Sequence, residues 1–495
     1  MSKFTISRRF NLHSMSRQKA FLDSALPTSA LLTVAAFAAL LGIIYFDAGN
    51  LRWNTRLFQS GHEWLSGILL LLALLTFLHR CRAPEWDVFS PVRLYYSIWF
   101  ALLGLGCLRL TTIEPPLTFR FWVTVACGWS GFLLGALWVR RRPPKGRRII
   151  IERLRRHWKV NWQPSRALLV AGCLFVVCLT AYLYSYSHAG MLPLFAENPN
   201  SARFDFGVNS YVQRFALSFY LLIFLSYVGV VHLRKLRFAF GVMGVVSFAA
   251  ITLLTARVLL LSAIWMIAIL FHYGQRRLTP KVAILAILIA YPLAKLAVDV
   301  KRFYQDPTFN RVLDKVDFPE RLRVFGPDYM YFTLTLQTLD NLTQIVPREL
   351  SYAHGWYIGY PVRVFWTPRQ GAGFRGRLDD LFWERSSDWS PVPTVTATYL
   401  GWPYADFGIP GVFVFSLVFG WISARVYESM RRGPTFWRIF LYSQLSFAIA
   451  LSIYTSYLSL FDLYWNVIVV GLFDRLVSKE EPFPERAIGS PAVEF

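Results

Sequence analysis

Arginine residues outside the most apolar segments are the feature of this chain that most favours chemistry. A guanidinium group is planar, stays charged and binds two phosphate oxygens at once without help from a metal ion. Their number predicts a site for a phosphate or pyrophosphate group. The alternative is that most of them pair with acidic neighbours in a solvated network. The residues concerned are Arg203, Arg214, Arg257, Arg302, Arg311, Arg321, Arg323, Arg348, Arg363, Arg369, Arg375, Arg377 and Arg385.

Arg257 differs from the other arginines in its surroundings. It stands in the segment ITLLTARVLLLS, between two apolar runs and without a polar loop beside it. A charge at such a position is costly in a membrane and marks a functional site by default. The alternative is that the side chain extends to the membrane surface while its aliphatic part stays in the apolar region.

The composition is that of a membrane protein. The chain has 495 residues, of which 55% are hydrophobic, and its mean hydropathy is +0.40. Typical soluble domains hold about 45–50% apolar residues even with glycine included. No stretch reads as a separate soluble domain, so Met1–Phe495 is expected to form one polytopic membrane domain. No small-residue cleavage site follows Phe46, so the first apolar segment is expected to be retained.

About twelve apolar segments are long enough to cross a bilayer as helices. This predicts an all-α integral membrane fold. Two pairs of these segments, the seventh with the eighth and the last two, are joined by very tight turns. The segments are Ala25–Phe46, Trp64–Leu78, Ser90–Leu108, Phe119–Val139, Ala167–Tyr186, Val212–Val231, Phe238–Thr255, Val258–Tyr273, Val282–Val298, Ile409–Ala424, Ile439–Tyr454 and Tyr457–Leu472.

The charges of the connecting segments orient the spans. Alternate connections, beginning with Met1–Ser24, hold most of the 52 Lys and Arg but only about a third of the 29 Asp and Glu. These segments, and with them both termini, should therefore face the cytoplasm. The run Arg140–Lys159 is the strongest of them, and its expected role is contact with anionic lipid. The net charge of +23 is thus explained without a nucleic-acid partner.

One large extracytoplasmic loop, from Asp299 to Asp406, is predicted between the ninth and tenth spans. Loops of this length are usually functional or disordered, and its many Trp, Tyr and Phe argue against disorder. Asp328–Ile345 has helical apolar spacing, with Asp328 as an N-cap after Gly326-Pro327, and should lie on the membrane surface or cap the bundle. The stretch Arg348–Trp383 reads as irregular.

Neither the cysteines nor the histidines are arranged to form disulfide bonds or to bind a metal ion. All five cysteines lie in or beside apolar segments and the eight histidines are scattered, so we expect no disulfide framework, no metal site and no cofactor.

Three segments share features with a known family, and the first of them is the turn just before the eighth predicted span. They are the turn Thr255-Ala256-Arg257, the stretch Gly355–Arg369 (GWYIGYPVRVFWTPR), and Thr394–Ile422, which runs through Asp-Phe-Gly into a glycine-containing span. Together with about twelve spans and one dominant late loop, they resemble the Wzy-type O-antigen polymerases, which join oligosaccharide repeat units. The resemblance covers mainly Thr255–Ile422.

The family's outer loops are also described by an arginine followed, after ten residues, by glycine. Arg348 and Gly359 have this spacing. The loop Ser187–Tyr211 carries no second copy, so the resemblance does not extend to a matching pair of loops.

The resemblance implies a glycosyltransferase of the bacterial inner membrane. Such an enzyme takes undecaprenyl-pyrophosphate-linked repeat units on the periplasmic face and transfers the growing glycan onto the next lipid-linked unit, building O-antigen or exopolysaccharide. Its implied partners are the lipid-linked oligosaccharide and the bilayer, together with a chain-length regulator and a flippase.

The departing polyprenyl pyrophosphate carries negative charge, which arginine can stabilise. Arg257 is the first candidate for this catalytic role. Under the same resemblance, the arginines expected to bind substrate are Arg203, Arg214, Arg348, Arg363 and Arg369.

The acceptor hydroxyl requires orientation and a base. His354 and Asp406 are the candidates, followed by Glu349. Otherwise His354 is a solvated loop residue and Asp406 the N-cap of the tenth span. The aromatic residues suited to sugar stacking, or alternatively to an interfacial belt, are Trp356, Tyr357 and Trp366.

Other activities remain open at this stage. A related glycan ligase would have much the same site, and Asp47 after the first span could be the acid of a polyprenyl-phosphate-sugar glycosyltransferase. A transporter or flippase places charges and broken helices near the membrane midplane, whereas Lys295 and Asp462 lie near span ends.

Overall fold

The computed structural model divides the chain into two compact units, Met1–Gly61 and His62–Phe495. The structure describes residues 55–79, 81, 86–111, 117–140, 160–196, 202, 210–275, 278–279, 282, 318–366 and 396–478. Two predicted spans, Ala25–Phe46 and Val282–Val298, therefore lie outside the described residues, as does much of the predicted loop. Almost all of the described residues belong to the second unit.

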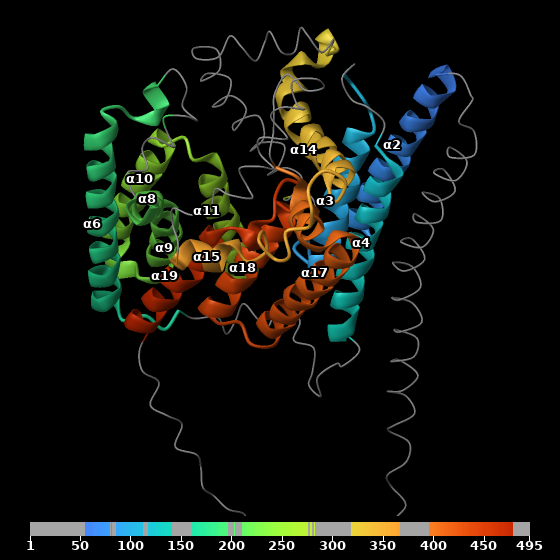
Figure 1. Ribbon diagram of the computed structural model, residues 1–495. Coiled ribbons are helices and arrows are strands. Elements are labelled where there is room, and N and C mark those ends of the chain that lie inside the picture. The colour runs from blue at the N-terminus through green and yellow to red at the C-terminus, as the bar shows by residue number, and fades with distance from the viewer. Residues whose placement is uncertain are drawn as a thin grey trace, which may run out of the picture. The chain divides into compact units, whose positions relative to one another are not determined.

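The described part is all-helical, and its one extended contact is an isolated bridge between Trp162 and Ser478 (Figure 1). The α-helices are α2 (Thr55–Leu78), α3 (Pro91–Gly106), α4 (Phe119–Arg140), α6 (Pro164–Ala189), α8 (Ser210–Leu217), α9 (Phe219–His232), α10 (Arg237–Leu253), α11 (Arg257–Leu270), α14 (Gly326–Ile345), α15 (Tyr360–Trp366), α17 (Thr398–Arg432), α18 (Phe436–Ala450) and α19 (Phe461–Val477). Short helical turns are η1 (Pro193–Phe195), η2 (Arg234–Leu236), η3 (Phe271–Gln275), η4 (Glu320–Phe325) and η5 (Tyr457–Ser459).

The described residues contain 6 helices long and apolar enough to cross a membrane, as expected of a membrane-spanning protein. Helices α2, α3, α18 and α19 cover the other predicted spans within the described residues, wholly or in large part. The helical class is thus confirmed, while the number of spans and the large loop remain predictions. The helices long enough to cross are Phe119–Val139, Pro164–Phe195, Tyr211–His232, Arg234–Leu253, Val258–Gln275 and Thr398–Arg432.

Helix α17 differs most from its prediction, because it begins well before Ile409 and contains a break at Gly408. Gly408 has φ 67° and ψ −153°, a conformation open essentially to glycine alone. The hydroxyl oxygens of Tyr399 and Ser416 lie 2.8 Å apart, although a straight helix would separate these residues by about 25 Å. Helix α17 is therefore two arms that lie side by side and meet at Gly408.

Glycines let α4 approach the second arm of α17 closely. A Cβ added at Gly131 or Gly135 would overlap the backbone of α17, and one at Gly420 would overlap the backbone of α4. Small residues give membrane helices this kind of contact. The first arm also packs on α4, since Leu400 lies against Gly128. Both arms of α17 are thus packed against α4, which is long enough to cross a membrane.

Helix α14 lies in the interior and not on the surface. It packs against α3, α4 and α17, and its Leu334, Leu339 and Ile345 are buried (Figure 1). Buried threonines are accommodated by bonds to carbonyl groups; Thr338, for example, donates to Leu334 at 2.7 Å. The predicted N-cap Asp328 is wrong: the helix begins at Gly326, because Pro327 fits the first turn of a helix.

A second group of helices surrounds an apolar core on the other side of the bundle. Helices α6, α8 to α11, α18 and α19 contribute to it, with Phe219, Leu225 and Phe440 fully buried. The predicted span Val212–Val231 is divided here into α8 and α9 by a turn at Ser218, whose hydroxyl donates to the carbonyl of Arg214 at 2.7 Å. Helix α15 contacts α19, so the segment after α14 reaches this second group.

Candidate functional site

The loop that follows α14 is anchored to α17 next to its break. The Ala353 N–H donates to the Ala405 carbonyl at 2.9 Å, and the His354 N–H donates to the Asp406 carbonyl at 3.2 Å. The Asp406 carboxylate accepts the N–H groups of Tyr357 at 3.0 Å and Ile358 at 2.8 Å. Four backbone donors thus hold this loop, which leads into α15, against the first arm of α17.

Asp406 is fully buried, at 0% exposure. It lies two residues before the break at Gly408, and its carboxylate binds N–H groups of the loop and not of the second arm, which is not the arrangement of a helix N-cap. Because its carboxylate already accepts two backbone hydrogen bonds, its evident task in the structure is to position the loop. The predicted role as a base remains a prediction.

The chain reverses sharply where the loop meets the break. His354 has φ 48° and Gly355 has φ 91°, both in the left-handed region, and Gly408 follows at φ 67°. A Cβ at Gly408 would stand 2.8 Å from the hydroxyl oxygen of Tyr352. The His354 side chain is exposed.

Arg363 and Trp356 form the most distinctive pair of the site. The guanidinium carbon of Arg363 lies 3.4 Å from the centroid of the Trp356 ring, and its Nη2 donates to the Trp356 carbonyl. Desolvation lowers the pKa of Arg363, and the negative charge of Asp406 opposes that change. The group stays charged because an arginine pKa starts above 12. A cation of α15 is therefore held against the indole of the loop that leads into this helix.

The aromatic residues predicted to stack on sugars are not equivalent. Tyr357 is only 5% exposed, and its ring packs edge-on against Trp402 with centroids 5.1 Å apart. Trp356 is partly exposed, and Arg363 lies over its ring. Trp366 ends α15, but its side chain lies outside the described residues. Of the three, Trp356 is the one that the structure places next to a cation.

Arg257 is the first residue of α11, after a very tight turn from α10, as predicted. Thr255 adopts φ 56°, and the Ala256 carbonyl accepts the N–H groups of Leu259 and Leu260, both at 3.1 Å. The backbone of Arg257 therefore stands at the end of a helix. Its side chain lies outside the described residues.

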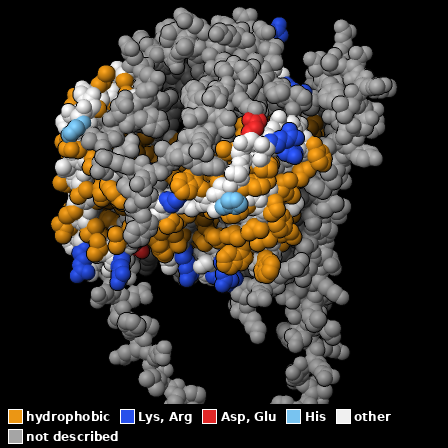
Figure 2. Space-filling view, in the orientation of Figure 1, with side chains coloured by type: hydrophobic (Ala, Val, Ile, Leu, Met, Phe, Trp, Pro, Cys, Tyr) orange, Lys and Arg blue, Asp and Glu red, His pale blue; other side chains and the backbone are white. Residues whose placement is uncertain are grey.

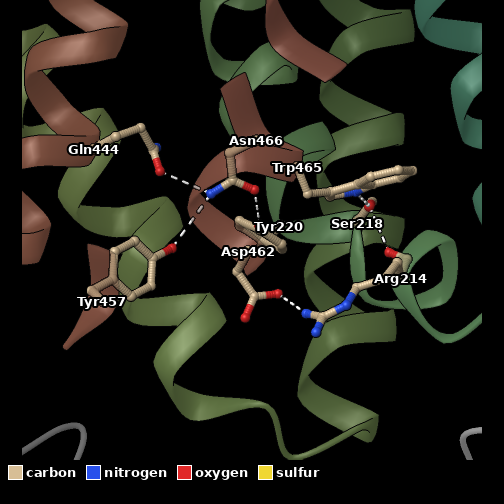
Figure 3. Close-up of polar contacts among 8 residues, drawn as sticks. All are labelled: Arg214, Ser218, Tyr220, Gln444, Tyr457, Asp462, Trp465 and Asn466. Carbon is tan, nitrogen blue, oxygen red and sulfur yellow. Dashed lines mark hydrogen bonds and ion pairs between the residues drawn. The ribbon is translucent and has the colours of Figure 1, made fainter. Parts of the chain in front are cut away.

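Arg214 forms an ion pair with Asp462 (Figure 3). Its guanidinium carbon also lies 5.2 Å from the centroid of the Phe461 ring. For this arginine the structure shows the paired state that the sequence left as the alternative. Three further hydrogen bonds tie α19 to its neighbours next to the pair. The Trp465 indole N–H donates to Ser218 at 2.8 Å, and Asn466 donates to Gln444 at 2.8 Å and accepts from Tyr220.

The remaining predicted binding residues are not gathered at the loop. Arg348 is exposed just after α14, and Arg203 and Arg369 lie outside the described residues. Within the described residues, no group of three or more His, Cys, Asp or Glu side chains could hold a metal ion.

Trp402 and Arg120 belong to the site but were missed from the sequence. Trp402 precedes Asp406 by one helical turn and packs on Tyr357. Arg120 Nη1 and the Tyr404 hydroxyl both donate to the Thr343 carbonyl, at 3.4 Å and 3.3 Å. A signal for Arg120 was present, because it opens a predicted span much as Arg257 does.

A second buried polar cluster, around Asp87, lies in the connection between α2 and α3. Its carboxylate accepts the hydroxyl groups of Tyr273 and Tyr427, both at 2.7 Å, and the Phe89 N–H at 3.0 Å. His272 Nδ1 accepts the Leu278 N–H, so its proton is on Nε2, 3.3 Å from Asp87. Burial raises the pKa of Asp87, but these donors outweigh burial and hold it below its usual value.

Comparison with known proteins gives no assignment: no family model, no curated protein and no solved structure matches this chain.

Proposed function

We propose that this protein is a membrane glycosyltransferase that polymerises oligosaccharide repeat units carried on a polyprenyl pyrophosphate. The observation that carries the proposal is the Arg363–Trp356 stack, presented by a loop fixed to the break of α17. A guanidinium suits a pyrophosphate, and an indole face suits a sugar ring. The resemblance of Thr255–Ile422 to O-antigen polymerases supports the same activity.

In the proposed reaction, a hydroxyl oxygen of the acceptor sugar attacks the anomeric carbon of the donor glycan. The bond from that carbon to the pyrophosphate oxygen breaks, and polyprenyl pyrophosphate leaves with its electron pair. Arginines stabilise the charge that develops on it. Arg257 and Arg363 are assigned this task, and Arg203, Arg348 and Arg369 contribute to binding, whereas Arg214 is held by Asp462. The proton of the acceptor hydroxyl passes to a base, for which the exposed His354 is better placed than the buried Asp406.

The reaction is assigned to the periplasmic face of the bacterial inner membrane. Both termini would be cytoplasmic, and the protein would work next to a flippase that supplies donor and a regulator of glycan length. No cofactor is needed, because arginine supplies the positive charge.

One observation also favours a second function. Broken helices next to polar side chains are common in transporters, where they form the substrate site, and α17 is such a helix. A flippase for the same lipid-linked glycan is therefore the competing proposal. A ligase shares the donor and differs only in the acceptor.

The test is made in a strain that lacks this protein, complemented with wild type, Arg363→Ala or Arg257→Ala. Polymerase activity predicts that the ladder of surface glycan lengths shrinks to a single repeat unit in the deletion and in both variants. The control is Arg321→Ala, since Arg321 is an exposed arginine outside the proposed site.

Other outcomes overturn the proposal. Full-length glycan left on its lipid carrier would identify a ligase. Single repeat units held on the cytoplasmic face would identify a flippase. An unchanged ladder in the deletion strain would refute a role in glycan assembly.

A further inference from the structure

Three cations are grouped at the turn between α9 and α10. Arg234, Lys235 and Arg237 are all exposed, within four consecutive positions. The Nε of Arg237 donates to the carbonyl of Val230 at 3.0 Å, which fixes its guanidinium across the turn and leaves its terminal nitrogens for other partners. We refer to these three residues as the turn cations.

The turn cations have no acidic neighbour in the sequence. Asp205 and Asp299 are the nearest acidic residues on either side. Among the described residues, neither the Arg214–Asp462 ion pair nor the His272–Asp87 contact involves this turn. The positive charge here is therefore not balanced by the described part of the protein.

An exposed apolar stripe begins directly at the turn. Phe238 is 86% exposed, Val242 is 48% exposed and Val245 is 71% exposed. Their spacing places them on one face of α10. In Figure 2, Lys and Arg side chains gather along one edge of the molecule, below a broad hydrophobic band. A cationic group and an adjoining apolar face match the two parts of a phospholipid.

We propose that the turn cations bind the phosphate headgroup of an anionic phospholipid, with an acyl chain along Phe238, Val242 and Val245. A free phosphate ion would use the cations but not the stripe, and a zwitterionic lipid would leave the charge unbalanced. The inference requires only that the protein spans a membrane and does not depend on the proposed glycosyltransferase activity.

The test measures retention of phosphatidylglycerol by the full-length protein in detergent, using native mass spectrometry at several lipid concentrations. The variant is Arg234→Gln/Lys235→Gln/Arg237→Gln. Each cation near a membrane surface raises the affinity for anionic lipid about fivefold. The triple variant should therefore bind phosphatidylglycerol at least about tenfold more weakly than wild type. Phosphatidylcholine should bind weakly to both proteins.

The matched control is Arg425→Gln/Arg432→Gln/Arg475→Gln, which removes the same charge. These exposed arginines lie at the ends of α17 and α19, each within four residues of Glu428 or Asp474. Their loss should change phosphatidylglycerol binding by less than about twofold. Equal weakening in both triple variants would overturn the proposal, because binding would then follow net charge alone.

Two further measurements keep the result interpretable. Thermal unfolding must show that the variant is folded, and Arg237→Lys, which keeps the charge, should retain most of the binding. Phe238→Ser/Val245→Ser should weaken lipid binding with the cations intact. If that variant binds normally, or if inorganic phosphate competes at the same concentration as the lipid, the site is an anion site and the proposal fails.

Discussion

Asp406 shows how far a single residue can be interpreted from the sequence. Its position before Phe407-Gly408 marked it as a candidate base, but its carboxylate accepts the N–H groups of Tyr357 and Ile358. Those partners lie 49 and 48 residues away, and no pattern in the chain connects them to it. A carboxylate offers the same chemistry for proton transfer and for holding a loop, so only geometry separates the two uses.

If Asp406 holds the loop, Asp406→Ala leaves two buried N–H groups without an acceptor. We expect a loss of about 1–3 kcal/mol in the free energy of unfolding, measured as a lower unfolding temperature in detergent. Asp406→Asn should be nearly as harmful, because its amide NH2 would face one of the same donors.

The control for this prediction is Glu349→Gln, since Glu349 is exposed. It should change stability by less than about 0.5 kcal/mol. An Asp406→Asn protein with wild-type stability and no glycan ladder would contradict the anchoring role and favour a base.

The arginines show that the sequence can indicate a residue type without indicating the partner of each side chain. Composition and position directed attention to the arginines, and Arg363 lies over the ring of Trp356. Arg214, chosen on the same grounds, is paired with Asp462 across two helices. The partner of a long charged side chain is decided by helix packing, which single residues do not encode.

At the scale of elements, hydrophobic periodicity located the helices, whereas the backbone conformation at proline and glycine decided where they begin or break. The span after Phe119 agrees with α4 almost to the residue. Helix α14 begins early because Pro327 starts a helix well. The stretch expected to be irregular contains the short α15, and the break of α17 was missed. Glycine at position 408 is consistent with either a helix or a break until φ is known.

The break of α17 should be sensitive to the smallest change at Gly408. In Gly408→Ala, alanine must adopt a conformation open essentially to glycine, and its methyl group stands 2.8 Å from the Tyr352 hydroxyl oxygen. We expect a cost of about 1–3 kcal/mol in the free energy of unfolding and a weakened glycan ladder, because the anchored loop packs on this point. Thermal unfolding and the ladder assay measure the two effects.

Gly172→Ala is the control for the break, since a Cβ there meets nothing within 4 Å. It should leave stability unchanged or raise it by up to about 1 kcal/mol, because alanine is the better helix former. Equal effects of the two substitutions would contradict the assigned importance of the break.

At the scale of the molecule, Asp87 connects three parts of the chain that sequence patterns treat separately. Its carboxylate accepts the hydroxyl groups of Tyr273, just after α11, and of Tyr427, near the end of α17. It also accepts the backbone N–H of Phe89 in the connection between α2 and α3. Helix α11 starts at Arg257 and α17 holds Asp406 near its other end. The two helices that carry predicted site residues are thus tied together at their far ends.

Asp87→Asn should weaken this tie, because an amide cannot accept from all of these donors. We expect a loss of about 2–4 kcal/mol in the free energy of unfolding, the sum of several bonds to a charged group. Tyr427→Phe should cost less, since it removes one donor and leaves the carboxylate with the others. Tyr464→Phe, at an exposed tyrosine bonded to the Leu458 carbonyl, should be nearly neutral. Similar unfolding temperatures for Asp87→Asn and Tyr464→Phe would contradict the tie.

The orientation of the whole molecule can be tested independently of its chemistry. Helices α17 and α19 end at the lower edge of the described helices in Figure 1, and the charge of the connections predicts that the anchored loop is periplasmic. In a cysteine-free background, Ser351→Cys should react with a membrane-impermeant thiol reagent in intact spheroplasts. Arg432→Cys should react only after the membrane is opened. Both positions are exposed, so access to solvent is matched. The reverse pattern would place the Arg363–Trp356 stack in the cytoplasm, where a periplasmic polymerase could not use it.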